Sequence, residues 1–191
     1  HFHLFEANPR MINLLNQSID VHQDYSFQLT QSCLSDREGH TPFHLTTTQS
    51  GQSHVATSGE EGINVLNLLL DKYCQDNGIV RIDFAKIDLE GHEIPALKGW
   101  RQSLGKQNPK ALYIEIIPEN QARYGYETNS PLAFLESLGY QLFLCKPDDF
   151  GTFGCTVENH TFKEGTLPLS EFKAEDYPLS FATDVLALAR K

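Results

Sequence analysis

The order of apolar and polar positions predicts a chain in which strands alternate with helices. Residues 1–6 form a short apolar run. Asn8-Pro9 then supplies a helix N-cap residue followed by proline at the first helical position. The apolar residues that come next have helical spacing: Ile12, Leu15 and Ile19. The pattern therefore predicts a helix over about residues 9–20 that packs on a sheet.

The rest of the chain continues this alternation. Further strands are predicted over residues 26–34, 41–48, 79–89, 111–117, 140–145 and 182–189. Helices are predicted from the spacing of Ile94, Leu97 and Leu104, and over residues 131–138. Strands that alternate with helices indicate an α/β fold with a doubly wound, mostly parallel sheet, formed as a single domain by residues 1–191. Ligands of such sheets bind outside the carboxyl ends of the strands.

Three segments are less regular. Residues 63–74 are apolar, but their pattern does not separate strand from helix. Residues 49–62 (QSGQSHVATSGEEG) are polar and glycine-rich and are predicted to form a mobile loop. The interval 146–180 is long and rich in glycine, proline and acids. Because loops on a rigid scaffold commonly carry specificity, the last two segments are the expected determinants of ligand choice.

Composition narrows the class of protein. The 191 residues are 40% hydrophobic and 21% charged, which is ordinary for a soluble globular protein. No run approaches the ~18 apolar residues of a membrane span. The net charge of −10 argues against nucleic-acid or anionic-membrane partners, since both would be repelled. Four scattered cysteines without a CxxC pair predict thiols in a reducing cytoplasm rather than a zinc site or a disulfide framework.

The stretch FAKIDLEGHE (84–93) places unusual charge at the carboxyl end of a predicted buried strand. Lys86 and Asp88 share one face of that strand, and Gly91 permits a sharp turn into the next helix. A lysine in a central strand needs an acidic partner or water, and Glu115, the lone acid of ALYIEII, is the predicted partner across the ladder. Glu93 falls in the first turn of the next helix, where a negative charge is favoured.

His92 follows the two acids Asp88 and Glu90 at this strand end. A neutral imidazole there can take a proton from a substrate hydroxyl. The alternative is that His92 has no catalytic role and is a surface or helix-capping histidine. A metal site built from these three side chains is a further alternative, but the spacing is not diagnostic, and no metal is predicted.

Two segments resemble a known family. HLFEANP (3–9) and IDFAKIDLEGHEIPALKGW (82–100) are similar to the signature segments of the FkbM family of S-adenosylmethionine-dependent methyltransferases. The segments that lie between and after them also follow that family's order: CLSDREG (33–39), VLNLLLDKY (65–73), ALYIEIIPE (111–119), ESLGYQLF (136–143) and TDVLALAR (183–190). The resemblance implies the Rossmann-like class I methyltransferase fold, with an antiparallel last strand.

The resemblance also implies roles for individual residues. Glu6 occupies the place of the acid that holds the ribose hydroxyls of S-adenosylmethionine, and a carboxylate can accept hydrogen bonds from both hydroxyls. The other residues implied to bind the cofactor are Ala7, Asn8, Ser35, Asp36 and Asp88. The residues implied to surround the methyl group and its acceptor are Lys86, Asp88, Glu90 and His92. The expected reaction is O-methylation of a hydroxyl on a sugar or natural product, because family members typically act on such acceptors.

One departure from the family pattern is a missing element. No first strand with a glycine-rich loop precedes Glu6, since only five residues come before it. Without that central strand, its two neighbours would keep unpaired edges, so we expect that upstream residues of the natural protein are absent or that another segment fills the gap. Two alternatives stay open: a nucleotide-binding oxidoreductase, which also uses an acid at the place of Glu6, and a non-catalytic binding module derived from this fold.

Overall fold

The computed structural model describes residues 1–46, 50–145, 157–158, 161–162, 169–177 and 183–190. The chain forms two compact units. Unit 1 comprises His1–Val80 and Leu89–Gln102, and unit 2 comprises Arg81–Asp88 and Ser103–Lys191. The single domain predicted for residues 1–191 stays a prediction. No helix in the described part of the chain is long and apolar enough to cross a membrane.

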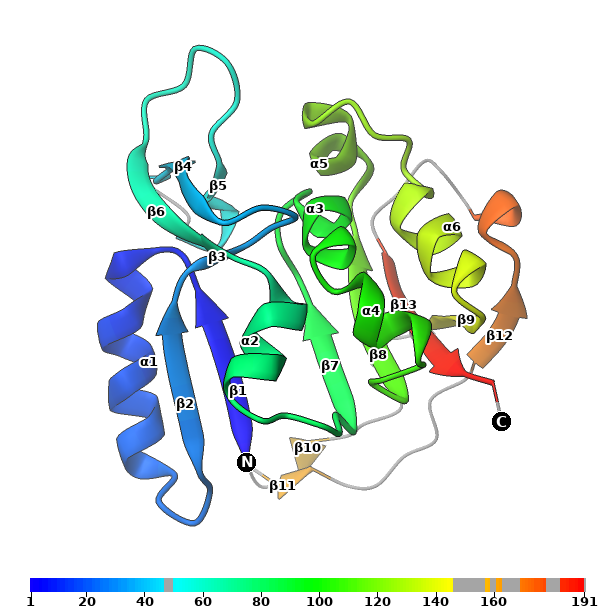
Figure 1. Ribbon diagram of the computed structural model, residues 1–191, viewed down its shortest axis with the longest axis horizontal. Helices are drawn as coiled ribbons and strands as arrows, with labels where there is room; N and C mark the ends of the chain where they lie inside the picture. The colour runs from blue at the N-terminus through cyan, green and yellow to red at the C-terminus, as the bar shows by residue number, and fades with distance from the viewer. Residues whose placement is uncertain (47–49, 146–156, 159–160, 163–168, 178–182, 191) are drawn as a thin grey trace. The chain divides into compact units, whose positions relative to one another are not determined.

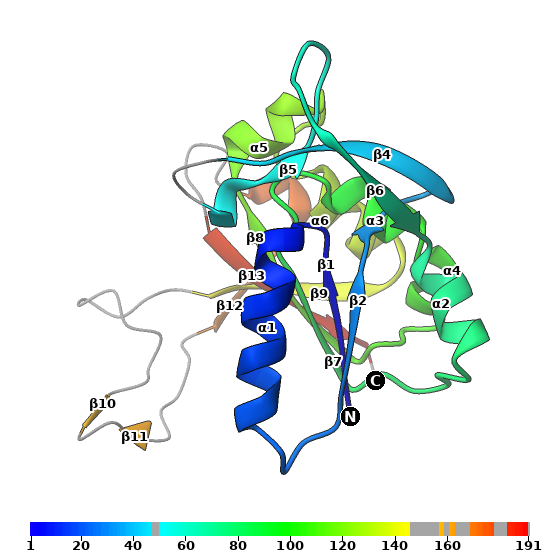
Figure 2. The ribbon, with the colours of Figure 1, turned by 90° about the vertical axis from the view of Figure 1, so that its left-hand side faces the viewer.

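Unit 1 begins with a β-α-β arrangement (Figures 1 and 2). Strand β1 (Phe2–Glu6) leads into helix α1 (Pro9–Val21), which returns the chain to β2 (Phe27–Gln31), parallel to β1. The helix starts where the sequence predicts, because the Asn8 side chain accepts a hydrogen bond from the backbone N–H of Arg10. No residue of α1 is fully buried, so its apolar face is only half covered.

The second sheet of unit 1 has the strand order β3-β6-β4-β5. Its strands are β3 (Cys33–Leu34), β4 (Gly39–His44), β5 (His54–Val55) and β6 (Ile63–Leu68). Strands β3 and β6 are parallel, whereas β4 is antiparallel to both β5 and β6. The prediction of a loop over 49–62 was therefore wrong in part, because this segment contains β5 and the 3₁₀ turn η1 (Ser50–Gln52). Residues 47–49 lie outside the described residues.

The structure assigns the ambiguous segment 63–74 and divides the helix that was predicted from Ile94, Leu97 and Leu104. Residues 63–74 hold both kinds of element: β6 ends at Leu68, and α2 (Leu70–Asp76) begins at once. The helix expected after residue 93 is interrupted, since α3 (Glu93–Lys98) ends and α4 (Arg101–Gly105) begins on the other side of Gly99-Trp100. Gly99 lies so close to the backbone of Ser35 that an added Cβ would be 1.9 Å from the Ser35 carbonyl oxygen.

Unit 2 contains a five-stranded sheet in the order β12-β9-β13-β8-β7. Its strands are β7 (Phe84–Ile87), β8 (Ala111–Ile116), β9 (Tyr140–Cys145), β12 (Leu169–Phe172) and β13 (Thr183–Ala189). Alternate residues of β8 and β13 form the centre of its core and are fully buried: Leu112, Ile114, Ile116, Val185 and Ala187. The last strand, β13, is antiparallel to both neighbours, as the resemblance implies.

The remaining elements of unit 2 are short. Helix α6 (Ser130–Ser137) ends just before Gly139, whose φ of 91° suits glycine. The sequence pattern did not predict α5 (Pro118–Arg123), the 3₁₀ turn η2 (Ala174–Asp176), or the hairpin of β10 (Val157–Glu158) and β11 (Thr161–Phe162). Most of the interval 146–180 lies outside the described residues.

The described sheets are mixed. Three strand pairs are parallel (β1–β2, β3–β6 and β7–β8), and six are antiparallel. The α/β class is therefore confirmed, but these strands do not form one mostly parallel sheet. Strands β3 and β4, which the bend at residues 36–38 connects, illustrate the mixture: both pair with β6, β3 in the parallel and β4 in the antiparallel direction.

We predict that Gly99→Ala destabilises the protein by about 2 kcal/mol or more, because the new methyl group would overlap the Ser35 carbonyl and force α3 away from it. Gly105→Ala is the matched control, since nothing lies within 4 Å of its added Cβ. Alanine should leave stability there unchanged or raise it by up to about 1 kcal/mol. Urea unfolding measures both variants, and equal stability of the two would contradict the close packing.

Candidate functional site

The turn after β1 holds the first predicted site residues. The backbone N–H of Asn8 donates to Oε1 of Glu6 over 2.6 Å, which fixes one oxygen of the carboxylate. Glu6 is half-buried, Ala7 and Asn8 are buried, and no described residue contacts the second carboxylate oxygen of Glu6 within hydrogen-bond distance. The backbone carbonyl of Glu6 accepts from Ser32 N over 3.1 Å, so the turn is also tied to the chain after β2.

Ser35 and Asp36 follow β3 in the same unit. The Ser35 N–H donates to the Leu68 carbonyl over 2.9 Å, and its hydroxyl contacts Oδ1 of Asp36 at 3.4 Å. Ser35 is buried, whereas Asp36 is exposed. The buried serine therefore fixes the backbone from which Asp36 projects.

His92 interacts electrostatically with this segment. Burial lowers the pKa of the His92 imidazole to about 4, and of the two nearby charges Asp36 opposes this shift while Arg37 adds to it. Asp36 and His92 are therefore brought into electrostatic range of each other although 55 residues separate them in the sequence. At neutral pH the His92 imidazole is uncharged.

The turn that carries His92 is fixed by a buried carboxylate. Glu93 is 2% exposed, and its Oε1 accepts from the N–H groups of Leu89 and Gly91 at 3.1 and 3.2 Å. Glu90 and Gly91 both have positive φ, 54° and 99°. His92 is the N-cap residue of α3, but its side chain makes no capping bond. Glu93 thus lies in the first helical turn, as predicted, and also closes the loop before it.

Lys86 and Asp88 lie in unit 2, where they form a direct ion pair of 2.7 Å. The hydrogen bond to Asp88 is the main cause that raises the pKa of Lys86, and Glu115 and Asp184 add to this effect. Strands β7 and β8 are neighbours, as the proposed Lys86–Glu115 pair requires, but the ion pair that the structure shows for Lys86 is with Asp88. Glu115 contributes at longer range.

Asp184 is an acid of this group that sequence reasoning missed. It lies directly opposite Glu115 in the β13–β8 ladder, and two carboxylates in that position repel each other unless a cation is near. A signal was present, since Asp184 is the only acid within an apolar strand, as Glu115 is in its own strand.

Ser53 was also missed: its Oγ contacts the Asn8 amide at 3.3 Å, yet it lies in a polar segment whose pattern gives no sign of this contact.

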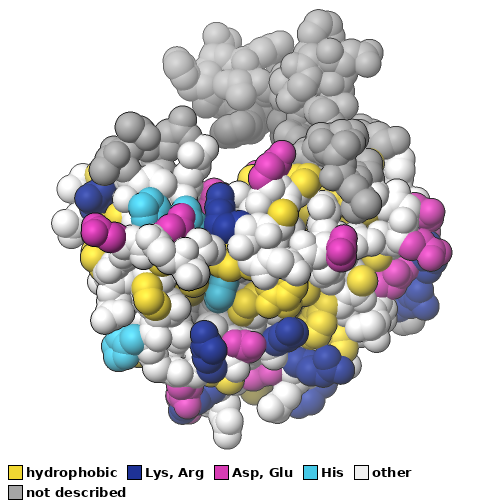
Figure 3. Space-filling view, turned by 90° about the horizontal axis from the view of Figure 1, so that it is seen from above, with side chains coloured by type: hydrophobic (Ala, Val, Ile, Leu, Met, Phe, Trp, Pro, Cys, Tyr) yellow, Lys and Arg dark blue, Asp and Glu magenta, His cyan; other side chains and the backbone are white. Residues whose placement is uncertain are grey.

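The predicted site residues thus fall in two places. Unit 1 holds Glu6, Ala7, Asn8, Ser35, Asp36, Glu90 and His92. Unit 2 holds Lys86 and Asp88. Their roles stay predictions. Within the described chain, no group of three or more His, Cys, Asp or Glu side chains is placed to hold a metal ion. Figure 3 shows charged side chains of both signs interspersed among the described residues on the face it presents.

The thiols that the structure describes agree with the sequence. Cys33 and Cys74 are free and buried, and burial raises the pKa of the Cys33 thiol to about 12. Such a thiol is unreactive at neutral pH. Cys155 lies outside the described residues, as does the side chain of Cys145.

Comparison with known families identifies the chain. The family model of the methyltransferase FkbM domain matches residues 1–142. The chain belongs to the FkbM methyltransferase family. The match runs from β1 to the first half of β9 and includes both signature segments, whereas the similarity suggested for residues 183–190 lies beyond it. Searches of curated proteins and of solved structures gave no match.

We predict that the stability of this FkbM domain depends on pH through His92. The folded protein holds the imidazole neutral down to a pKa of about 4, whereas the unfolded chain binds a proton near the ordinary value of 6.5. The free energy of unfolding should therefore fall as pH decreases from about 6.5 to 4, with a slope of up to about 1.4 kcal/mol per pH unit from this residue alone.

The His92→Gln variant should lose that component of the slope. His40→Gln is the control, because His40 lies exposed in β4. Chemical unfolding at several pH values between 7 and 4 measures both variants against the original protein. An unchanged slope in His92→Gln would show that the imidazole is not held neutral by burial.

Proposed function

We propose that this FkbM protein is an S-adenosylmethionine-dependent O-methyltransferase that acts on a hydroxyl of a sugar or natural product. The observation that carries the proposal is the Glu6 turn, where a half-buried carboxylate has one oxygen fixed by Asn8 and the other without a partner among the described residues. A ribose supplies two adjacent hydroxyls, and such a carboxylate oxygen can accept hydrogen bonds from them. Family membership supports methyl transfer as the reaction.

The other residues of unit 1 fit the remaining parts of the cofactor. Ser35 and Asp36 offer a backbone segment and a carboxylate to the adenine amino group, and Ala7 and Asn8 shape the turn beside the ribose. When bound, S-adenosylmethionine supplies a methyl group on a sulfonium, which needs in-line positioning of its acceptor. In this proposal Lys86, Asp88 and Glu90 bind and orient the acceptor, and Asp88 also contacts the methionine part of the cofactor.

His92 is the proposed general base. Its imidazole is neutral at physiological pH, so a ring nitrogen can accept the proton of the acceptor hydroxyl. The carboxylate of Asp36 favours the imidazolium that results. Because burial strongly disfavours that cation, the proton has to leave His92 after transfer for the next cycle to begin.

We also propose the type of sheet, the class of acceptor and the location of the protein. The parallel pairs β1–β2 and β7–β8, each joined through helices in the chain order, and the antiparallel β13 support a doubly wound sheet of the class I methyltransferase type. The net charge of −10 supports a small-molecule or saccharide acceptor rather than nucleic acid or an anionic membrane. The two free, buried thiols support a reducing cytoplasm as the location.

Calorimetric titration with S-adenosylhomocysteine tests the cofactor assignment. We expect saturable one-to-one binding, and Glu6→Gln should weaken it about 10- to 100-fold, since charge-assisted hydrogen bonds to the ribose are lost while an oxygen remains for Asn8 N–H. Glu38→Gln is the control, because Glu38 is an exposed carboxylate outside the turn. Equal affinity of the two variants would refute the role of Glu6.

Turnover of His92→Ala tests the proposed base. With an acceptor hydroxyl identified by product analysis, kcat should fall at least 100-fold, the usual scale for loss of a general base, while the affinity for S-adenosylhomocysteine changes less than about twofold. A variant that turns over at the original rate across pH 6–9 would exclude His92 as the base.

A further inference from the structure

A hydrogen-bonded chain leads from the Glu6 carboxylate to Ser53, the residue that directly precedes β5. Asn8 N–H donates to Glu6 Oε1 over 2.6 Å, and Asn8 Nδ2 donates to Ser53 Oγ over 3.3 Å. Asn8 is 1% exposed and Ser53 is 8% exposed, so both groups are shielded from water. A buried amide N–H that loses its acceptor costs about 1–3 kcal/mol, and Asn8 is therefore strongly constrained to face Ser53.

The orientation of the Asn8 side-chain amide is fixed by a second hydrogen bond. Its Oδ1 accepts the Arg10 N–H over 3.0 Å to cap α1, which directs Nδ2 toward Ser53. Rotation of the side chain to find a new partner would break the cap. The backbone N–H of Asn8, which holds Glu6, is thus positioned from two sides: by the helix and by Ser53.

Ser53 is itself held independently of Asn8. The Thr46 N–H donates to Ser53 Oγ over 3.2 Å, and the Thr46 hydroxyl contacts the same oxygen at 3.3 Å. The next two residues pair with β4 through His44↔His54 and Phe43↔Val55. Ser53 therefore belongs to a fixed support and does not simply follow the Glu6 turn.

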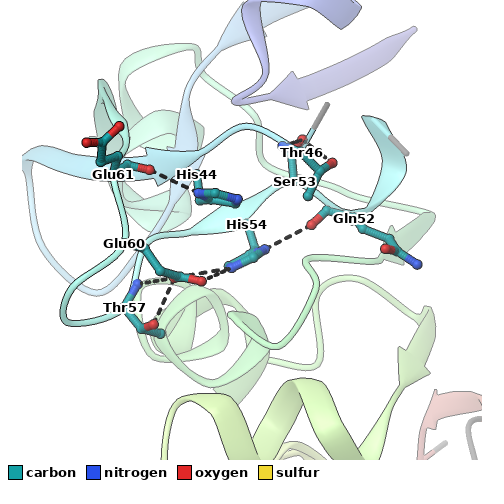
Figure 4. Close-up of polar contacts among 8 residues, drawn as sticks. All are labelled: His44, Thr46, Gln52, Ser53, His54, Thr57, Glu60 and Glu61. Atoms are coloured by element: carbon teal, nitrogen blue, oxygen red, sulfur yellow. Dashed lines mark hydrogen bonds and ion pairs between the residues drawn. The ribbon is translucent and has the colours of Figure 1, made fainter. Parts of the chain in front are cut away.

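The side chain of His54 strengthens this support, as Figure 4 shows. His54 is 6% exposed; its Nδ1 faces the Gln52 carbonyl at 2.9 Å, and its Nε2 faces the Glu60 carboxylate at 3.3 Å. Both partners are hydrogen-bond acceptors, and each of them faces one ring nitrogen. Hydrogen bonds from Thr57 lower the pKa of Glu60 to about 2, which keeps the carboxylate ionised beside His54. Both ring nitrogens of His54 are therefore held by contacts within the same segment, residues 52–60.

We propose that Ser53 is a positioning residue for cofactor binding: through Asn8 it holds the Glu6 carboxylate in the orientation that receives the ribose hydroxyls. The inference rests on the proposed function and goes beyond it, because it assigns to Ser53, which directly precedes β5 and lies outside the signature segments, a part in the affinity for the nucleoside. Removal of the Ser53 hydroxyl should weaken the hydrogen bonds that Glu6 makes to the ribose and leave contacts to the rest of the cofactor unchanged.

The test compares two ligands by calorimetry: S-adenosylhomocysteine and its analogue that lacks both ribose hydroxyls. Ser53→Ala should weaken binding of S-adenosylhomocysteine about fivefold, the value of one ordinary hydrogen bond, and weaken binding of the analogue less than twofold. Ser53→Thr keeps the hydroxyl and should restore the difference between the two ligands. Ser58→Ala removes an exposed serine of the following turn and should leave both affinities unchanged.

The outcomes separate the two hypotheses. If the original protein binds neither ligand, the proposed cofactor is wrong, and the role of Ser53 falls with it. If the original protein binds S-adenosylhomocysteine but Ser53→Ala changes both affinities equally or neither, the cofactor assignment stands and the positioning role is refuted. Thermal unfolding of each variant is measured first. Should Ser53→Ala not fold, Ser53→Cys, which keeps the side-chain volume but is a much weaker acceptor, replaces it in the same comparison.

Discussion

The buried amide of Asn8 must satisfy all its hydrogen-bonding groups away from water, and the first half of unit 1 is arranged around that requirement. One oxygen caps α1, one nitrogen contacts Ser53, and the backbone N–H holds Glu6. Each contact joins a different part of the chain: the helix, the β4–β5 segment and the end of β1. A single residue of 1% exposure therefore couples the start of a helix to the geometry of a carboxylate. Since unpaired buried polar groups are costly, the three contacts support one another.

A second buried polar group, the Glu93 carboxylate, fixes the turn that bears His92. Glu93 accepts two backbone N–H groups from the loop before its own helix, so the positive φ angles of Glu90 and Gly91 are held by the carboxylate that follows them. The close approach of Gly99 to Ser35 then joins the end of α3 to the segment that carries Asp36. These contacts explain why His92 and Asp36 interact although they belong to distant parts of the sequence. The positions of these two side chains thus depend on backbone turns and not on the strands alone.

The sequence predicted the elements whose signals are local. Asn8-Pro9 marked the start of α1, and Gly139 marked the end of α6. Lys86, Asp88 and Glu115 marked part of the charged group of unit 2, but Asp184 was missed. Features that depend on distant partners were not predictable in this way. The β5 strand consists of two residues in a polar, glycine-rich segment and exists because His54 and Val55 pair with β4 and are buried. The close approach of Gly99 to Ser35, which lies more than sixty residues earlier, likewise could not be predicted from helix propensity. No sequence pattern marks Ser53, because the residues that it contacts, Asn8 and Thr46, are not adjacent to it in the sequence.

The two groups of charges differ in how firmly their side chains are held. Lys86 pairs with Asp88, and the carboxylates of Glu115 and Asp184 act on it at longer range. Such a group attracts hydroxyl and amine donors, and its half-exposed position allows it to exchange partners with a ligand. The Glu6 turn is the opposite case: one carboxylate oxygen is fixed from within the protein, and only the other is available. A fixed carboxylate suits a ligand of constant structure, as a cofactor is, whereas a group with exchangeable partners suits an acceptor. This contrast in rigidity, more than the charge of either group, supports the assignment of the cofactor to Glu6 and of the acceptor to the strand ends that bear Lys86 and Asp88.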